Sequence, residues 1–383
     1  QAANILVSAN QTAGVTYALA SSSGTADVIG LTLGTGTTTA AATSITGGAL
    51  NVTGFETLNI VANPGATATV GANKVSTIAS LTGATLKAVN LSGSAVTITN
   101  AATTVAATFD ASKLTGDGTV AGANGLNIGG SLVTGSTVIG SDFIDTVAIG
   151  AVGSTYNTGK GADVISATQA VIAGSIINGG EGVDTLTITD TANPTINDNT
   201  FVNVTGIEKF ALGAFTGVNW VVGGYANAAA TANGGVLDIS AATSGTVANP
   251  VVIDASGLGA GNSLKLALTE ITGVTAAGDM TITGSSGADN IKITTVATNL
   301  GDITINAAVG TAAKTVDLSG VAAAAAVTVT TGAGADVIKA AGVAGTYTGG
   351  LGADTFTAGA AVDTFAMSTN GSVIGTSMDK ISG

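Results

Sequence analysis

The chain has 383 residues, of which only 9% are charged and 3% are aromatic, and its formal net charge is −13. It has no Cys and no His, and all ten of its cationic side chains are lysines. This excludes disulfides, thiolate metal sites, Ser-His-Asp triads and HExxH zinc sites, so we expect no enzyme. The acidic balance also argues against a nucleic-acid partner, which requires a basic surface, and favours a cation instead.

The residue types favour a protein built from β-strands. Val, Ile and Thr prefer pleated strands, the 57 Gly suit tight corners, and only 3 Pro are present. No run of eighteen apolar residues occurs, and the first residues, QAANILVSAN, carry no basic segment before an apolar one. We therefore expect a soluble, all-β chain without a membrane span or a signal peptide.

A glycine-rich turn that ends in an aspartate recurs along the chain. In chain order its copies read SSGTADVIG, GSDFIDTVA, TGKGADVIS, GGEGVDTLT, GSSGADNIK, TGAGADVIK, GGLGADTFT and AGAAVDTFA. Glycine permits left-handed backbone angles, so several carbonyl oxygens of such a turn can point into one hollow that the aspartate also faces. Calcium takes roughly six to eight hard oxygen ligands in irregular geometry, and this arrangement suits it.

A single copy of the turn would be read as a β-turn in which the aspartate bonds its own backbone, but the repetition favours calcium. The apolar residue two positions after the aspartate, as in Leu186, Ile291, Ile338 and Phe356, is predicted to turn inward at the start of a strand. The candidate calcium ligands are Asp27; Asp145; Gly159, Gly161 and Asp163; Gly180, Gly182 and Asp184; Gly284, Gly287 and Asp289; Gly332, Gly334 and Asp336; Gly350, Gly352 and Asp354; and Asp363.

The spacing of the aspartates predicts that the turns stack. Asp145 and Asp163 are 18 residues apart, as are Asp336 and Asp354, and this interval is one full turn of a small parallel β-coil. Neighbouring rungs lie roughly 4.8 Å apart, so stacked carboxylates would repel one another unless a cation lay between them. Asp363 follows nine residues after Asp354 and is predicted on the opposite edge. The sequence thus predicts a parallel β-helix or β-roll solenoid with calcium-binding glycine-rich turns.

A second motif reads FDASKLTG around Asp110 and IDASGLGAG around Asp254, so both copies share the order apolar-Asp-Ala-Ser-x-Leu, with weaker copies at Asp238 and Asp317. In each copy the apolar residue is predicted to face inward and the aspartate outward. An aspartate in this place caps an Asx-turn more readily than it binds a metal.

The two motifs recur together. The second motif precedes a calcium turn by 35 residues in both parts of the chain, and the pair repeats at an offset of 144. VTGFETLNI at Glu56 and VTGIEKFAL at Glu208 precede them in the same order, and both glutamates are predicted to cap turns rather than to bind a cation. We expect an internal duplication, with residues 1–176 as the first solenoid half and residues 177–383 as the second, which carries the C-terminal calcium repeats.

Two further stretches have alternative interpretations. Trp220 stands near Phe215 and Tyr225, and this cluster is either an exposed platform for a sugar ring or, as we expect, filling for the core at a joint between coils. Residues 321–334, VAAAAAVTVTTGAG, have the alanine content of a helix, but the β-branched residues of their second half predict a narrow rung followed by a strand.

The glycine-rich turns resemble the calcium-binding nonapeptide of RTX proteins. Taken with the Thr-, Ala- and Gly-rich composition, the DASxL rungs, the VTGxE turns and the absence of Cys, the chain resembles the crystalline surface-layer (S-layer) proteins of the Caulobacter type, which are exported by type I secretion. The resemblance implies a secreted structural protein of the bacterial cell surface. It also implies calcium-dependent self-association into a two-dimensional lattice, with lipopolysaccharide or another surface glycan as the anchor.

Two other functional classes stay open. A calcium-stiffened RTX adhesin would bind a surface glycan or receptor, and an exposed site around Trp220 would indicate it. An extracellular hydrolase carried on an RTX tail would need a non-repeating catalytic domain, whereas repeats occupy this chain almost from end to end.

Overall fold

A computed structural model describes residues 2–19, 24–34, 44–63, 75–117, 124–130, 132–241, 246–273, 278–295, 300–367 and 379–383. In these ranges the chain is nearly all-β, and long parallel sheets of many strands form a solenoid of the β-helix or β-roll kind, as the sequence predicts. The chain divides into two compact units, which are Gln1–Leu186 with Asn203–Ile207, and Thr187–Val202 with Glu208–Gly383. The sequence prediction places this division between residues 176 and 177.

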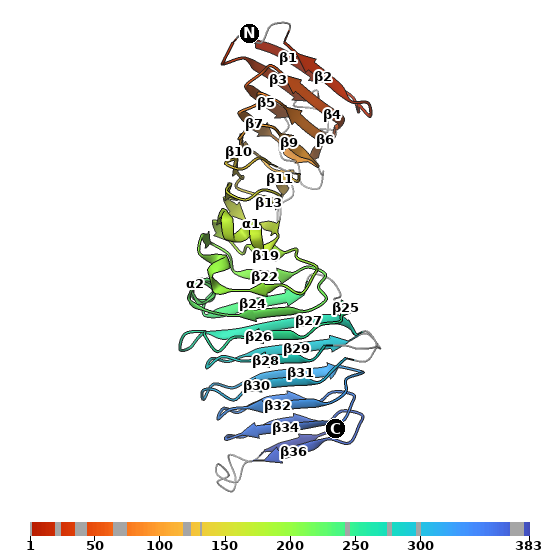
Figure 1. Cartoon of the computed structure of the whole chain (residues 1–383), viewed down its shortest axis with the longest axis vertical. Helices are drawn as coiled ribbons and strands as arrows, with labels where there is room; N and C mark the ends of the chain where they lie inside the picture. Colours follow the sequence, from red (N-terminus) through yellow and green to blue (C-terminus); the bar gives the residue numbers. More distant parts are fainter. Residues whose placement is uncertain are drawn as a thin grey trace. The chain divides into compact units, whose positions relative to one another are not determined.

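The coils of unit 1 contribute strands to two faces, named here face A and face B (Figure 1). Face A contains, in order, β1 (Ala2–Val7), β3 (Val28–Leu33), β5 (Thr57–Ala62), β7 (Ala88–Gly93), β10 (Thr108–Leu114), β12 (Thr137–Ile139), β14 (Thr155–Asn157), β17 (Ile176–Asn178) and β21 (Val204–Thr205). Face B contains β2 (Val15–Ala18), β4 (Thr46–Thr53), β6 (Val75–Gly83), β8 (Ala95–Ile98), β9 (Ala101–Thr103), β11 (Asn124–Ile128), β13 (Ile144–Ala148), β16 (Val164–Ala167) and β19 (Thr185–Ile188).

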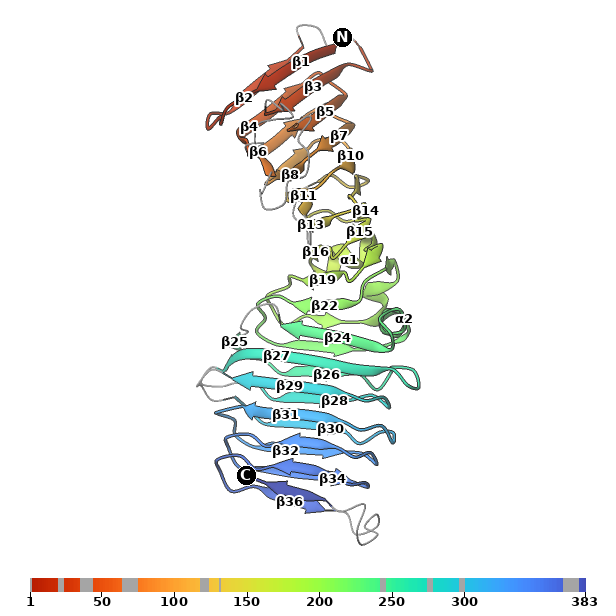
Figure 2. The same cartoon turned by 180° about the vertical axis from the view of Figure 1, so that it is seen from behind.

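Unit 2 repeats this plan, and Figure 2 shows its strands following one another in parallel rows. Face A contains β20 (Thr195–Ile196), β23 (Val218–Val221), β26 (Val251–Asp254), β28 (Met280–Thr283), β30 (Ile303–Ala307), β32 (Val327–Thr331), β34 (Gly345–Gly350) and β36 (Thr364–Met367). Face B contains β22 (Lys209–Leu212), β24 (Val236–Ala241), β25 (Thr246–Val247), β27 (Ser263–Gly273), β29 (Asn290–Thr295), β31 (Thr315–Gly320), β33 (Val337–Lys339), β35 (Thr355–Thr357) and β37 (Lys380–Ser382).

The core of each unit lies between its two faces. Residues alternate between buried and half-buried positions along β3 and β5, because successive side chains of a strand point to opposite sides. In-register pairing then places the buried residues of one coil directly beside those of the next, so that the apolar side chains form continuous rows. On face B of unit 2 one such row consists of Leu266, Ile291, Val316, Ile338 and Phe356.

This row confirms the predicted inward direction of the apolar residue that follows each aspartate by two positions. Ile291, Ile338 and Phe356 are fully buried in unit 2, and Leu186 is fully buried as well. Burial of an aliphatic or aromatic side chain of this size contributes roughly 1.5–3 kcal/mol. The rows therefore fix which side of each strand faces inward, and with it the position of the turn that precedes the strand.

In the described ranges, three helical segments depart from the all-strand expectation: α1 (Gln169–Gly174), the 3₁₀ helix η1 (Asp198–Phe201) and α2 (Gly224–Ala232). Helix α2 carries the alanine-rich stretch GYANAAATA, which has high helix propensity. Its first amides are capped from η1, because the Asp198 carboxylate accepts hydrogen bonds from the N–H groups of Tyr225 and Ala226. A contact between distant segments thus starts the helix.

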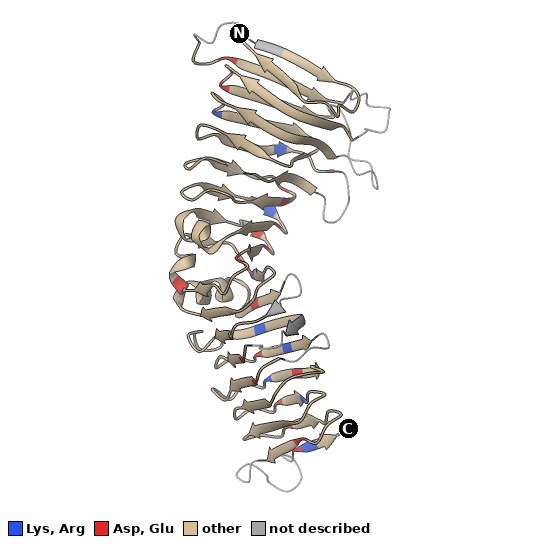
Figure 3. Ribbon diagram, turned by 45° about the vertical axis from the view of Figure 1, so that its right-hand side comes forward, with Lys and Arg blue, Asp and Glu red and all other residues tan. Residues whose placement is uncertain are grey.

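The alanine-rich stretch at 321–334 forms no helix, as predicted, and β32 covers its β-branched half. Charged side chains are sparse over the ribbon (Figure 3). In the described part of the chain, none of the helices has the length and the apolar character needed to cross a bilayer.

Candidate cation site

The glycine-rich turns stack on one another before the strands of face B. Each turn has six positions with the aspartate at position 6, and turns 158–163, 179–184, 331–336 and 349–354 carry Gly at positions 2 and 4. In three of these turns the glycines have positive φ, which is 103° at Gly159, 127° at Gly161, 98° at Gly180, 142° at Gly182, 87° at Gly350 and 130° at Gly352.

A side chain at these glycines would also collide with the preceding turn. A Cβ at Gly350 would overlap the carbonyl oxygen of Gly332, and a Cβ at Gly352 would overlap that of Gly334. The glycines therefore allow the turns to approach so closely that the carbonyl oxygens of positions 2 and 4 lie directly beside the next turn.

The aspartates of unit 1 connect neighbouring turns through one carboxylate oxygen. Asp163 Oδ1 accepts a hydrogen bond of 2.7 Å from the N–H of Asp145, and Asp184 Oδ1 accepts one of 2.8 Å from the N–H of Asp163. Asp145 Oδ1 in turn accepts a bond of 2.5 Å from the N–H of Leu126. Each carboxylate thus binds the backbone one rung back along the chain.

Unit 2 has the same series of bonds, in which Oδ1 of an aspartate accepts a backbone N–H of the preceding rung; we call this series the aspartate ladder. Asp354 Oδ1 accepts a hydrogen bond of 2.9 Å from the N–H of Asp336, and Asp336 Oδ1 accepts one of 2.7 Å from the N–H of Lys314. Asp289 Oδ1 accepts a bond of 2.9 Å from the N–H of Leu264. The ladder brings together the predicted residues Asp289, Asp336 and Asp354 on one edge of face B.

The second carboxylate oxygen of several aspartates has no partner. Asp163, Asp336 and Asp354 are at most 1% exposed, and within the described residues no hydrogen-bond donor contacts their Oδ2 atoms. A buried, unpartnered carboxylate oxygen is costly, because it has lost its water without gaining another donor. A hard cation that bound both Oδ2 and the neighbouring carbonyl oxygens would remove this cost, so the donor set fits calcium.

Burial also changes the pKa values of these carboxylates. It raises the pKa of Asp163 to about 7 from its usual 3.8, although the hydrogen bond from the N–H of Asp145 acts in the opposite direction. Burial likewise raises the pKa of Asp145 to about 6 and that of Asp354 to about 6. Without a cation, the burial of the Asp145, Asp163 and Asp354 carboxylates is therefore relieved when they bind a proton.

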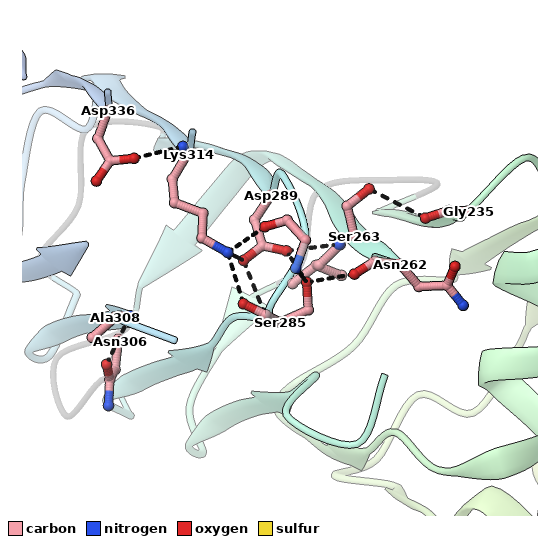
Figure 4. A network of polar contacts seen from close by, with 11 residues as sticks. Gly235, Asn262, Ser263, Ser285, Asp289, Asn306, Ala308, Lys314 and Asp336 are labelled. Carbon is pink, nitrogen blue, oxygen red and sulfur yellow. Dashed lines mark hydrogen bonds and ion pairs between the residues drawn. The ribbon is translucent and has the colours of Figure 1, made fainter. Parts of the chain in front are cut away.

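A lysine occupies position 6 of one turn. The register of β29, β31 and β33 places Lys314 in the same row as Asp289 and Asp336, at the end of turn 309–314, which reads VGTAAK. Lys314 is fully buried, and its Nζ donates to the carbonyl oxygens of Ser285, at 2.7 Å, and Gly287, and to Asp289 Oδ2 at 3.0 Å (Figure 4).

The ammonium of Lys314 therefore contacts two of the three residues that the sequence predicts as calcium ligands in turn 284–289, Gly287 and Asp289. Its third partner is the carbonyl oxygen of Ser285 at position 2, whereas the prediction named Gly284 at position 1. Sequence reasoning missed Lys314 because the search was for aspartates at position 6. The only signal was a lone lysine in a glycine-containing turn between Asp289 and Asp336.

Three further polar residues of the ladder were also missed. Ser141 and Ser285 stand at position 2, where their N–H groups donate to Oδ2 of Asp145, at 2.5 Å, and of Asp289, at 2.9 Å. Asp379 extends the row of unit 2, because its Oδ1 accepts a bond of 3.0 Å from the N–H of Asp354. The sequence before it, IGTSM, lacks the paired glycines of turns 331–336 and 349–354.

Asp27 and Asp363 stand apart from these rows, because they precede the face A strands β3 and β36. Both oxygens of Asp363 accept hydrogen bonds, at 3.2 Å from the N–H of Gly345 and at 3.0 Å from that of Gly359. The N–H of Asp27 donates to Glu56 Oε2 at 2.8 Å, so Glu56 caps the neighbouring coil. The Asp363 carboxylate thus has the bonding pattern of a turn cap.

The second motif behaves as predicted at three of its four aspartates. Asp110, Asp254 and Asp317 each accept, at Oδ1, the N–H of the serine two residues later, at 3.0, 3.0 and 3.1 Å. The prediction is not confirmed for Asp238, which lies within β24. The Asp238 carboxylate pairs with Lys265 Nζ at 2.8 Å.

Trp220 is fully buried, which confirms that it fills the core. Its ring centroid lies 5.6 Å from that of Phe201 and 5.6 Å from that of Phe210, so its aromatic neighbours differ from those that the sequence suggested. Tyr225 is 42% exposed. Trp220 therefore offers no platform for a sugar ring.

Across the described ranges, no three or more His, Cys, Asp or Glu side chains converge as a metal-binding group. The oxygens that gather at the stacked turns are mainly backbone carbonyls, with one carboxylate from each turn. Comparison of the chain with family models, with curated proteins and with solved structures finds no match.

Proposed function

We propose that this protein is an RTX-type calcium-binding S-layer protein, a non-enzymatic structural component of a bacterial cell surface. Its fold supports this proposal, because a parallel solenoid presents the same turn once per coil and so repeats a cation site along one edge. The resemblance of the turns to the RTX nonapeptide supplies the identity of the cation. The lattice and the anchoring glycan are inferred from the resemblance alone.

The observation that carries the proposal is the set of buried Oδ2 atoms of Asp163, Asp336 and Asp354 without a donor. Their Oδ1 atoms already hold the neighbouring backbone, so the unpartnered oxygens serve no bond in the rungs themselves. In the row of unit 2, Lys314 takes the place of an aspartate, and its ammonium binds the turn of the preceding rung. The rows are therefore built for positive charge between rungs.

Calcium affinity connects these turns to export. Extracellular calcium modules bind with dissociation constants of roughly 0.1–1 mM, far above the calcium concentration of a cytosol. Turns of this kind remain without calcium during synthesis and bind it outside the cell. We propose that the chain completes its folding there, as the cation neutralises the stacked carboxylates.

The test is to count bound calcium by native mass spectrometry across a titration, in the protein and in two variants. Asp336→Asn removes a ladder carboxylate, and we expect it to bind at least one calcium fewer. Asp317→Asn is the matched control, because Asp317 lies on the adjacent rung but pairs with Lys339 and caps Ser319. Its calcium count should equal that of the unaltered chain.

Circular dichroism provides a second readout of the same titration. We expect β-structure to increase on going from chelator to millimolar calcium. A chain that binds no calcium, or a spectrum and a calcium count that Asp336→Asn leaves unchanged, would disprove the proposed function.

A further inference from the structure

The ammonium of Lys314 lies buried within the row of stacked turns. Both Lys314 and Asp289 are fully inaccessible at their side chains, and their ion pair measures 3.0 Å between Nζ and Oδ2. Lysine is almost never fully buried unless it is paired, because the loss of hydration of an ammonium costs several kcal/mol. Here three oxygens replace the water, which are Asp289 Oδ2 and the carbonyl oxygens of Ser285 and Gly287.

The two units differ at this place. Turn 140–145 of unit 1 matches turn 284–289 of unit 2, since in both the serine at position 2 donates its N–H and its hydroxyl to the aspartate at position 6. In unit 1 the next rung continues the row with Asp163, whereas in unit 2 it continues with Lys314. The same turn therefore faces a carboxylate in one unit and an ammonium in the other.

We propose that Lys314 Nζ is a built-in replacement for a divalent cation in turn 284–289, and that removing it turns this turn into a divalent-cation site. The inference rests on the proposed function, since it assumes that the other turns of the row bind calcium. It goes beyond that function by dividing the row of unit 2 into two parts. The rungs of Asp289 and Lys314 are held together at any calcium concentration, whereas those of Asp336 and Asp354 depend on the ion.

Hydrogen–deuterium exchange of the unaltered chain tests the division directly. The N–H of Leu264 bonds to Asp289 Oδ1, and the N–H of Asp336 bonds to Asp354 Oδ1, so the two amides report on equivalent bonds. We expect chelator to leave the protection of the Leu264 amide unchanged and to reduce that of the Asp336 amide. Equal loss at both amides would overturn the inference while leaving the proposed function intact.

Lys314→Met tests the replacement, and Lys339→Met is its control, because Lys339 pairs with Asp317 on the surface of the next strand of the same face. In native mass spectrometry with excess calcium, we expect Lys314→Met to bind one calcium more than the unaltered chain and Lys339→Met to bind the same number. In Lys314→Met the Leu264 amide should also become calcium-sensitive.

The outcomes separate the two proposals. An unchanged calcium count in Lys314→Met, with the Asp336 amide still calcium-sensitive, would overturn only the role of Lys314. If no amide of the unaltered chain responds to calcium and none is bound, the proposed function fails, and the inference fails with it. The exchange measurement on the unaltered chain keeps the inference falsifiable even if Lys314→Met does not fold.

Discussion

At the scale of single residues, the ladder aspartates divide their two oxygens between different tasks. Oδ1 accepts a backbone N–H from the neighbouring rung, and a hydrogen bond to a charged acceptor of this kind contributes more than one between neutral groups. Within the described residues, Oδ2 of Asp163 and of Asp354 has no hydrogen-bond partner. The net effect of each aspartate on stability therefore depends on what neutralises it.

This division predicts how the stability of the metal-free chain depends on pH. The pKa of Asp163 is about 7 in the folded state against 3.8 when unperturbed, so between these pH values the folded chain binds more protons than the unfolded chain. The free energy of unfolding then falls as the pH rises from about 4 to 7. In chelator we expect the melting temperature to be higher at pH 5 than at pH 8, and calcium should remove most of the difference.

Asp163→Asn should reduce this pH dependence. Asp142→Asn is the control, because the Asp142 side chain lies in the preceding turn but is 70% exposed. A melting temperature that rises between pH 5 and pH 8 in chelator would contradict the assignment of the raised pKa values to the folded state.

At the scale of elements, the turns and the strands that follow them form one repeating piece. The aspartate ladder sets the height of each turn, and the apolar row two residues later, from Leu266 to Phe356, sets which face of the strand is inside. Carbonyls and core side chains are thus placed by the same register. A shift of one residue would turn Phe356 outward and would also break the bond from Asp354 to the N–H of Asp336.

Much of this repeating piece was predictable, because its signals are local. The glycine-aspartate spacing predicted the stacked turns, and alternation predicted the inward residues Ile338 and Phe356. Lys314 was not predictable, since its role depends on oxygens that lie 25 to 29 residues away in the sequence. Helix α2 was missed for a related reason, because its capping group, Asp198, lies on a different segment.

The aromatic cluster at β23 provides a prediction for a single element. Trp220 is fully buried against Phe201 and Phe210, so Trp220→Ala should lower the free energy of unfolding of unit 2 by about 3–5 kcal/mol. Tyr225→Ala, at a side chain that is 42% exposed, should change it by less than about 1 kcal/mol. Chemical denaturation followed by tryptophan fluorescence, or by circular dichroism for Trp220→Ala, measures both. A near-neutral Trp220→Ala combined with a loss of glycan binding would instead support the adhesin alternative.

At the scale of the whole molecule, each unit carries its own row of aspartates, with Asp145, Asp163 and Asp184 in one and Asp289, Asp336 and Asp354 in the other. The chain as a whole carries a net charge of −13. Copies of such a chain repel one another until cations are bound, so calcium promotes both folding and close approach between copies.

We therefore expect calcium to induce assembly. Light scattering should report large particles at millimolar calcium and only small species in chelator, and electron microscopy should resolve ordered sheets. Magnesium at the same concentration is the control, because it demands strict octahedral geometry and retains its water, so it should produce little assembly. Ordered sheets in chelator, or no assembly in calcium, would contradict the lattice proposal.

The in-register pairing of the coils makes the spacing between neighbouring strands independent of the number of residues in each coil. The step from Thr137 to its partner Thr155 uses 18 residues, whereas the step from Thr57 to its partner Ala88 uses 31, yet both advance by one hydrogen-bonded strand. The number of residues in a coil can therefore change while the strands of face A keep the same parallel pairing. Peptides can therefore be grafted into the loops between strands without changing the spacing of the paired strands within a unit.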